Sequence, residues 1–349
     1  MNDSRRFHIV FVYSRSMPYP PSVDNIKAYY VSQEFVRRGA KVTWLQIGDV
    51  PAKWEEDGIE FVKMGSPAHR LIRMPIQLIQ MIAFCRSTDV DCVYSDEWLF
   101  FRGDLINRLL FQIGLKILGV RYALDQRDPF VDYEIAKGNL KEGSWRHRRL
   151  ELLNNLALRL TDLAIFPSET YADELRSRGL PAKNSIGTIR GVDDQQFNPQ
   201  VDGSTIRSSL GLNDKFVVGW FGMMTHYRQL EEVVIPLIEK ARDFIPDIHF
   251  LIGGHGDLEG AFSRLKDSRP DLGMTVLGFV PYPRLPEHLA ACDVLLGPLN
   301  TQYRLISLTS PLKIMESLAV GRPIIATETK VSKGDYRDLA GVVWTGGDY

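Results

Sequence analysis

The sequence predicts an α/β protein made of two doubly wound parallel-sheet domains, one after the other, and three observations support this. Short apolar runs alternate with longer amphipathic segments of helical period along the whole chain. The short runs are apolar throughout, as expected for parallel strands that are covered on both faces. The pattern restarts after a stretch rich in Pro, Gly, Asp and Ser at residues 198–214. We therefore predict an N-terminal domain over residues 1–190 and a C-terminal domain over residues 191–349.

Each domain begins with a strand, and helices separate the strands that follow. In the first domain a helix over residues 24–38 should end at Gly39, because glycine accepts the left-handed conformation of a helix C-terminus. The strands of the first domain are predicted at residues 8–13, 41–46, 92–95, 121–124 and 163–166. Those of the second domain are predicted at residues 216–221, 249–252, 274–277, 293–296 and 324–327. Ligands of open parallel sheets bind at the carboxyl ends of strands, so we expect the site in a cleft shared by the two domains.

Composition narrows the class of protein and its partners. A chain of 349 residues, 44% hydrophobic and 24% charged, has room for two cores and the balance of an ordinary soluble protein. The net charge of -1 gives no general attraction to nucleic acid, so any basic surface would be local. Three cysteines without CxxC spacing indicate reduced core thiols rather than disulfides or a zinc site. The first apolar run is too short for a signal peptide and no run is long enough to span a membrane, so a cytoplasmic location is expected.

The segment SPLKIMESLAVGRP, which begins at Ser310, is the most informative part of the chain. We predict a helix that Ser310 caps, with Pro311 as its first residue and Gly321 at its end. Its apolar face would hold four residues at helical spacing, namely Leu312, Met315, Leu318 and Ala319. The open amides at such a helix start attract phosphate, and Glu316 on the second turn could reach a bound ribose. The alternative is a surface helix on which Lys313 and Glu316 form an exposed ion pair.

Several segments together resemble the family-four glycosyltransferases of GT-B fold, and their order and spacing make the resemblance specific. They are LTDLAIFPSETYADELRSRGL (160–180), VVGWFG (217–222), HFLIGGHGDLEG (249–260), VLGFVPYPRLPEHLAACDVLLGPL (276–299) and SPLKIMESLAVGRPIIAT (310–327). The segment LDQRDPF (124–130) resembles a bacterial cell-surface polysaccharide branch of that family. The resemblance implies the GT-B fold, in which two Rossmann-like domains face a cleft.

The resemblance also implies that the second domain binds a nucleotide diphosphate sugar and the first domain binds a sugar or lipid-linked acceptor. Glu316 matches the glutamate that hydrogen-bonds the ribose, and Arg228 falls where a lysine usually holds the diphosphate. Backbone groups near Phe279 and Val280 are expected to contact the base. The other donor-binding positions implied by this match are Gly222, Ser310, Leu312 and Lys313.

The candidate catalytic residues are Arg127, Asp128 and Arg228. Arg127 and Asp128 follow a first-domain strand, so they should point into the cleft and contact the acceptor or the transferred sugar; an internal salt bridge is the alternative. Arg228 would stabilise the charge that develops on the leaving diphosphate. The resemblance further implies retention at the anomeric carbon, no metal ion, and no cofactor besides the donor, within polysaccharide or glycoconjugate synthesis.

The chain departs from the family pattern at several positions. Where the family has a second glutamate eight residues from the one matched by Glu316, this chain has Leu308. Met223 replaces the family's arginine after the strand-ending glycine, and Arg190 replaces an asparagine. A glycine pair before the first helix is replaced by Ser22-Val23. These losses keep two alternatives open: a non-catalytic nucleotide-sugar-binding or partner protein, and a sugar-nucleotide epimerase of the same fold.

Two short patterns have plain structural interpretations. Asp89-Val90-Asp91 looks like a metal-binding DxD motif but fits a turn between a helix and a strand, so no metal site is predicted. The segment Gly253-Gly254-His255-Gly256 follows a predicted strand and lacks the dinucleotide spacing. We expect positive φ angles or close backbone approach there, in a loop or turn beside the donor.

Three segments of the first domain are apolar with basic edges: residues 70–86, 100–119 and 145–159. Core helices with solvated faces are the favoured interpretation, and peripheral contact with an anionic membrane is the alternative. At the other end of the chain, residues 340–349 resemble the strand and turn that precede further C-terminal helices in this family. A protein without those helices is expected to have a small interdomain contact and an open cleft.

Overall fold

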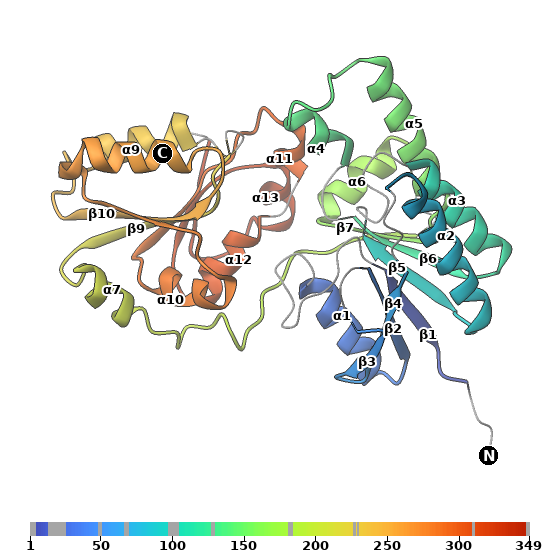
Figure 1. Cartoon of the computed structure of the whole chain (residues 1–349). Coiled ribbons are helices and arrows are strands. Elements are labelled where there is room, and N and C mark those ends of the chain that lie inside the picture. Colours follow the sequence, from blue (N-terminus) through green and yellow to red (C-terminus); the bar gives the residue numbers. More distant parts are fainter. Residues whose placement is uncertain are drawn as a thin grey trace. The chain divides into compact units, whose positions relative to one another are not determined.

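The computed structural model describes residues 5–12, 26–47, 51–65, 70–96, 105–126, 130–180, 184–225, 228, 230–308 and 311–346. The chain forms two compact units, Met1–Thr188 and Ile189–Tyr349, each built around its own sheet (Figure 1). We describe each unit by itself.

The first unit contains an eight-stranded sheet in the order β3-β4-β2-β1-β5-β6-β7-β8. Its strands are β1 (His8–Val12), β2 (Lys41–Ile47), β3 (Lys53–Glu56), β4 (Ile59–Met64), β5 (Cys92–Asp96), β6 (Arg121–Asp125), β7 (Leu163–Phe166) and β8 (Ser185–Gly187). Its helices are α1 (Ile26–Arg37), α2 (Arg70–Ser87), α3 (Leu105–Ile117), α4 (Phe130–Ala136), α5 (Trp145–Leu160) and α6 (Glu169–Ser177). Inside the edge strands, the order β4-β2-β1-β5-β6-β7 is the 3-2-1-4-5-6 order of a Rossmann sheet.

The prediction of parallel strands is wrong at one edge of this sheet, where β3 pairs antiparallel with β4. Asp57 and Gly58 connect the two strands and have φ values of 50° and 74°. Positive φ at both central residues is what a type I′ hairpin turn requires, and Asp-Gly is a typical sequence for it. This dipeptide was the signal that could have revealed the hairpin.

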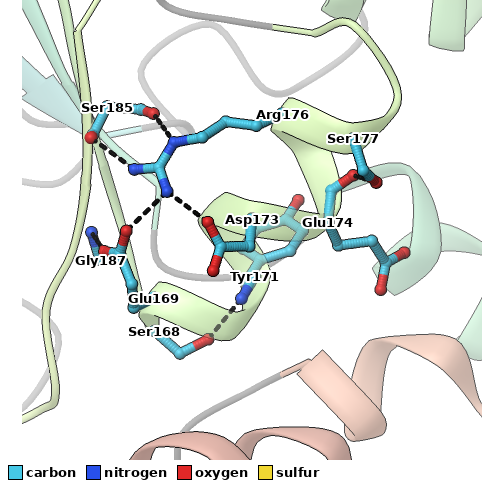
Figure 2. A network of polar contacts seen from close by, with 9 residues as sticks. All are labelled: Ser168, Glu169, Tyr171, Asp173, Glu174, Arg176, Ser177, Ser185 and Gly187. Carbon is cyan, nitrogen blue, oxygen red and sulfur yellow. Dashed lines mark hydrogen bonds and ion pairs between the residues drawn. The ribbon is translucent and has the colours of Figure 1, made fainter.

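Strand β8 is the last element before the chain enters the second unit, and Arg176 of α6 fastens it (Figure 2). The Arg176 guanidinium donates to the backbone oxygen and the hydroxyl of Ser185 at 2.7 and 3.0 Å. It also donates to the carboxylates of Glu169 and Asp173, each at 2.6 Å. Glu169 in turn accepts from the Gly187 amide at 2.6 Å. The edge strand is therefore fixed to α6 by side chains as well as by its ladder with β7.

The second unit contains a six-stranded parallel sheet in the order β11-β10-β9-β12-β13-β14, again 3-2-1-4-5-6. Its strands are β9 (Phe216–Met223), β10 (Ile248–His255), β11 (Met274–Gly278), β12 (Val294–Gly297), β13 (Ile324–Thr327) and β14 (Val342–Thr345). Its α-helices are α7 (Ser204–Leu210), α8 (Ile235–Ala241), α9 (Glu259–Ser268), α10 (Leu285–Ala290), α11 (Arg304–Leu308), α12 (Leu312–Ala319) and α13 (Lys330–Asp335). The strand order reverses between β9 and β12, which makes their carboxyl ends the expected place for a ligand.

Both faces of the second sheet are buried, as the continuous apolar strands predict. Alternate residues of β9 enter different cores: Val217 and Phe221 join one cluster, and Val218 and Trp220 join the other. This burial on both sides confirms the two-layer covering expected of a doubly wound sheet. The predicted fold class is confirmed for both units.

Candidate functional site

Glycine lines the carboxyl ends of β9 and β10. Gly222, Gly254 and Gly256 have φ values of 150°, 148° and 144°, which other residues rarely adopt. A Cβ on Gly254 would lie 1.9 Å from the Gly222 carbonyl oxygen, and one on Gly256 would lie 2.6 Å from the Met224 oxygen. The expected positive φ angles and close approach are confirmed. The glycine segment does not follow the strand, however, because β10 continues through His255.

Lys313 of α12 brings a positive charge to this edge of the sheet. Its Nζ is buried, has no hydrogen-bond partner among the described residues, and lies 4.7 Å from the centre of the Trp220 ring. A Cβ on Gly222 would be 3.5 Å from the same Nζ, so the glycine places bare backbone beside the amine. Burial, and then the charge of Arg228, lower the pKa of Lys313 to about 7, and Glu316 partly opposes this. A buried amine of this kind is ready to pair with an anion.

Arg228 supplies a second positive charge near Lys313, as its effect on the lysine pKa indicates. Arg228 is half-buried and lies in a 3-10 turn just before the helical segment that follows β9. That segment opens with a π-helical turn, Leu230–Val234, before α8 begins at Ile235. Such turns are rare and occur often at functional sites.

Glu316 is buried, with 7% of its surface exposed. Its carboxylate accepts a hydrogen bond from the Tyr282 hydroxyl. Burial raises the pKa of Glu316 to about 7, against the lowering effects of this hydrogen bond and of the Lys313 and Arg190 charges. The alternative of an exposed Lys313–Glu316 surface pair is therefore wrong: both charged groups lie inside the protein.

The start of α12 differs from the prediction in detail. Pro311 is the residue before the helix rather than its first residue, and no described side chain caps the helix. Ser310 lies outside the described residues. The Ile314 amide bonds to the Pro311 oxygen, whereas the Leu312 and Lys313 amides have no acceptor in the described part of the chain. Two open amides at a helix N-terminus suit a phosphate oxygen.

The predicted apolar face of α12 is wrong in part. The buried residues of the helix are Ile314, Glu316 and Ser317, whereas Leu312 and Met315 are half-buried. The side of the helix that carries Glu316 faces inward, because the Tyr282 hydroxyl donates a hydrogen bond to the Glu316 carboxylate there. Gly321, with a φ of 73°, ends the helix as predicted.

Phe279 and Val280 follow β11, two strands from β9 in the sheet order, or about 10 Å away at ordinary strand spacing. Phe279 is 64% exposed, and its ring edge meets His255 at 5.2 Å between centroids. Val280 is half-buried beside Gly253. The same connection continues to Tyr282, whose bond to Glu316 ties it to α12.

The structure thus brings most of the predicted donor-binding residues to one edge of the second sheet, and adds three that the sequence reasoning missed. Trp220, Tyr282 and Arg190 surround Lys313 and Glu316. Trp220 and Tyr282 carried no signal because a strand tryptophan and a loop tyrosine look like ordinary packing residues. Arg190 was noticed only as a departure from the family pattern.

Two departures from the family pattern have different surroundings. Leu308 ends α11 and is fully buried, with 0% exposure, so an apolar core holds this position. Met223, at the end of β9, is exposed. Neither position offers a charged group to a bound sugar.

In the first unit, Arg127 and Asp128 lie outside the described residues. Just before them, Asp125 is 1% exposed and accepts from Lys27 Nζ at 2.6 Å. The predicted turn at Asp89-Val90-Asp91 is confirmed: Asp89 has a φ of 49°, and Asp91 accepts from the His8 amide at 2.8 Å. No group of metal-binding side chains is found in the described part of the chain.

Residues 215–342, which include nearly the whole second sheet, match the family model described as glycosyl transferases group 1. No functionally curated protein matches the chain in sequence.

Solved structures match the whole chain in fold. Sucrose-phosphate synthase from Thermosynechococcus elongatus is 15% identical, with a TM-score of 0.70 over 97% of this chain and 86% of that one. HepE from Anabaena, solved with UDP, is 16% identical, with a TM-score of 0.65 over 97% and 85%. Starch synthase IV from Arabidopsis thaliana, bound to ADP and acarbose, is 13% identical, with a TM-score of 0.65 over 98% and 89%. The family match and the shared fold confirm the resemblance to GT-B glycosyltransferases.

Proposed function

We propose that the second unit binds a nucleotide diphosphate sugar at the carboxyl edge of its sheet, and that the protein transfers the sugar to an acceptor hydroxyl. The observation that carries this proposal is the buried Lys313 amine, which lacks a hydrogen-bond partner among the described residues. It lies beside the bare backbone of Gly222 and near a second cation, Arg228. A diphosphate would supply the missing acceptor.

The surrounding residues fit the other parts of such a donor. The Leu312 and Lys313 amides and the two cations would hold the diphosphate, and the Glu316 carboxylate would accept from a ribose hydroxyl. The exposed Phe279 ring offers a face for the base, and the backbone near Val280 offers polar groups to its edge. Matches solved with UDP and with ADP support this class of ligand.

The residues also account for the chemistry of transfer. When the glycosidic bond to the diphosphate breaks, negative charge grows on the leaving oxygen. Lys313 and Arg228 are fixed around that position in a site that burial keeps dry, so they stabilise the transition state more than the ground state. We include in this proposal retention at the anomeric carbon, no requirement for a metal ion or cofactor, and a role in polysaccharide or glycoconjugate synthesis. The similarity of residues 124–130 to a polysaccharide-type segment supports the last point.

A second candidate function is binding of the nucleotide sugar without transfer. It is favoured by Leu308, whose buried side chain replaces a glutamate of the family pattern. Hydrolysis or transfer of the donor, measured with and without a mixture of acceptor sugars, distinguishes the two functions. Release of nucleoside diphosphate at a rate above that of the donor alone in buffer supports transfer.

The binding site is tested by calorimetric titration with nucleoside diphosphates and with the matching nucleosides. Lys313→Met should weaken diphosphate binding roughly 100-fold, as expected when one partner of a desolvated charge pair is removed, and should leave nucleoside binding nearly unchanged. Lys215→Met is the matched control, because Lys215 precedes β9 at the opposite end of the same sheet and pairs with Asp247 at 3.1 Å. Equal losses for nucleoside and diphosphate, or a loss in the control, would place the phosphate site elsewhere.

A further inference from the structure

Helix α3 of the first unit is apolar on its outer side as well as on its inner side. Its buried apolar residues are Leu105, Leu109, Phe111 and Leu115. Its polar residues Asn107, Arg108 and Gln112 are buried, whereas its exposed residues are apolar apart from one lysine. The exposed apolar residues recur at spacings of four, three and four: Ile106, Leu110, Ile113 and Ile117. These spacings place all four on one side of the helix, and Ile117 is 80% exposed. An ordinary surface helix has charged and polar residues on its outer side.

Among the buried polar side chains of α3, Gln112 is bonded to residues at the end of α5. Gln112 Nε2 donates to the Ala157 oxygen and to Thr161 Oγ1, each at 3.0 Å. Arg108 lies near the hydroxyl of the fully buried Tyr122, and its Nε and Nη2 have no hydrogen-bond partner among the described residues. The Gln112 bonds help to fix the rotation of α3, whose isoleucine row lies on the outside.

The outer sides of α2 and α5 continue this apolar surface. Both helices contact α3, and the three run along the same side of the first unit (Figure 1). Exposed apolar residues on them are Ile79 of α2 and Trp145, Leu152 and Leu156 of α5. We call the exposed residues of the three helices the α2–α3–α5 face. Apolar surface of this extent is uncommon on a protein that contacts only water.

The charged residues of the α2–α3–α5 face have one sign. Among the exposed residues of α3, α5 and the described side chains of α2 there is no aspartate or glutamate, and the partly exposed Glu151 of α5 pairs with Arg178 at 3.5 Å. The exposed cations are Arg86, Lys116, Arg146, Arg148, Arg149 and Arg159. Arg149 lies over the Trp145 ring, 5.8 Å from its centre, and Lys116 pairs with Asp162 beyond the end of α5. Because the whole chain carries a net charge of only -1, this basic surface is local.

We propose that the α2–α3–α5 face lies on an anionic lipid surface. Isoleucine, leucine and tryptophan are residues that enter the acyl boundary, and arginines on the same face can meet lipid phosphates. A second copy of the chain is a poorer occupant, because a two-fold contact would bring the same arginines together. No described helix is long and apolar enough to cross a bilayer, so the contact would be peripheral.

This inference rests on the proposed function in one respect and sharpens it. A transferase held at a membrane acts on acceptors presented there, so the acceptor would be a lipid-linked sugar or lipid rather than a free sugar. Binding to vesicles, however, requires neither donor nor acceptor. The two proposals can therefore fail separately.

The test is co-sedimentation of the full chain with vesicles of phosphatidylcholine alone and with phosphatidylglycerol added. We expect binding to the anionic vesicles only, and weaker binding at high salt. Ile113→Ser/Ile117→Ser should lower the partition coefficient at least about tenfold, since two apolar side chains no longer leave water. Arg148→Gln/Arg149→Gln should lower it by a similar factor while leaving the apolar row intact.

Phe244→Ser is the matched control, because Phe244 is 83% exposed but belongs to the second unit. It should bind vesicles like the unmodified chain, and circular dichroism with urea unfolding should show that every variant is folded. Absence of binding to anionic vesicles, or equal binding by the Ile113/Ile117 variant, overturns the proposal. So does a concentration-dependent dimer, seen by light scattering, that the same variant abolishes, since the face would then join two copies.

Discussion

The two units share a strand order, but they differ in whether the buried charged group at the carboxyl ends of their strands has a partner among the described residues. In the first unit, the buried Asp125 carboxylate has Lys27 Nζ at 2.6 Å. In the second unit, the Lys313 amine is buried beside Trp220 with no described hydrogen-bond partner. A paired charge stabilises the unit that contains it, whereas a buried amine without an acceptor lowers stability until a ligand arrives. The contrast identifies which of two similar sheet edges is arranged for an anion.

The largest effect is expected from removing the paired lysine of the first unit. Lys27→Met should lower the free energy of unfolding by about 3 kcal/mol, the lower end for a broken buried pair, because Lys27 is itself partly exposed. Urea unfolding measures this change. The double variant Lys27→Met/Asp125→Leu should recover most of the loss, and diphosphate affinity of the folded protein should not change. A stable single variant would mean that the pair is not structural.

Replacing the buried lysine of the second unit by methionine should raise stability, whereas Lys27→Met should lower it. Lys313→Met should raise the free energy of unfolding at pH 7 by on the order of 1 kcal/mol, since it removes the cost of burying an amine. The folded pKa of about 7 lies below the ordinary value of 10.5, so this cost is greatest at and below pH 7 and disappears as the pH approaches 10.5. The gain of the variant should therefore shrink between pH 7 and 10. Destabilisation at pH 7 would show that the amine has a structural partner.

The affinity for a nucleoside diphosphate should depend on pH, because the Lys313 amine gains or loses a proton near pH 7. Above pH 7 the ligand-free Lys313 loses its proton, so affinity for a nucleoside diphosphate should fall by up to about tenfold per pH unit, with proton uptake on binding. Below pH 7 the raised pKa of Glu316 means that its carboxyl is protonated, which should weaken contact with the ribose. Calorimetry in buffers of different ionisation enthalpy measures both limbs. Lys313→Met should lack the alkaline limb, and a wild-type profile that is flat from pH 6 to 9 would contradict this assignment.

The smallest effect is expected at the exposed Arg176 network of Figure 2. Arg176→Met should cost less than about 1 kcal/mol, because its carboxylate partners are exposed and water screens them. The change should be local, with faster hydrogen exchange at the Gly187 amide and in β8 than elsewhere in the first sheet. A large global loss would show that β8 supports the whole unit.

Much of the fold could be predicted because its signals are local. The strand at Leu163–Phe166 and the strand at Ile324–Thr327 were predicted to the residue, since short apolar runs bounded by turn residues permit little else. The β3–β4 hairpin was not predicted, because its strands are polar on one side and do not form continuous apolar runs. The Asp57-Gly58 turn was the available signal. In the site, Glu316 and Lys313 were found through the helix start and the family resemblance, whereas Trp220 and Tyr282 were not.

The sequence by itself determined the order of helices and strands, the two-unit α/β class and the glycines at the strand ends, since each depends on residues close together in the chain. The tertiary structure decided which side of each helix faces inward. It buried Glu316 against Tyr282 and left the row Ile106, Leu110, Ile113 and Ile117 of α3 on the outside, where a solvated face was expected. The reason is physical: the rotation of a helix depends on the apolar residues it buries and on the hydrogen bonds it gains, and the partners, such as Tyr282 and Ala157, come from distant parts of the chain.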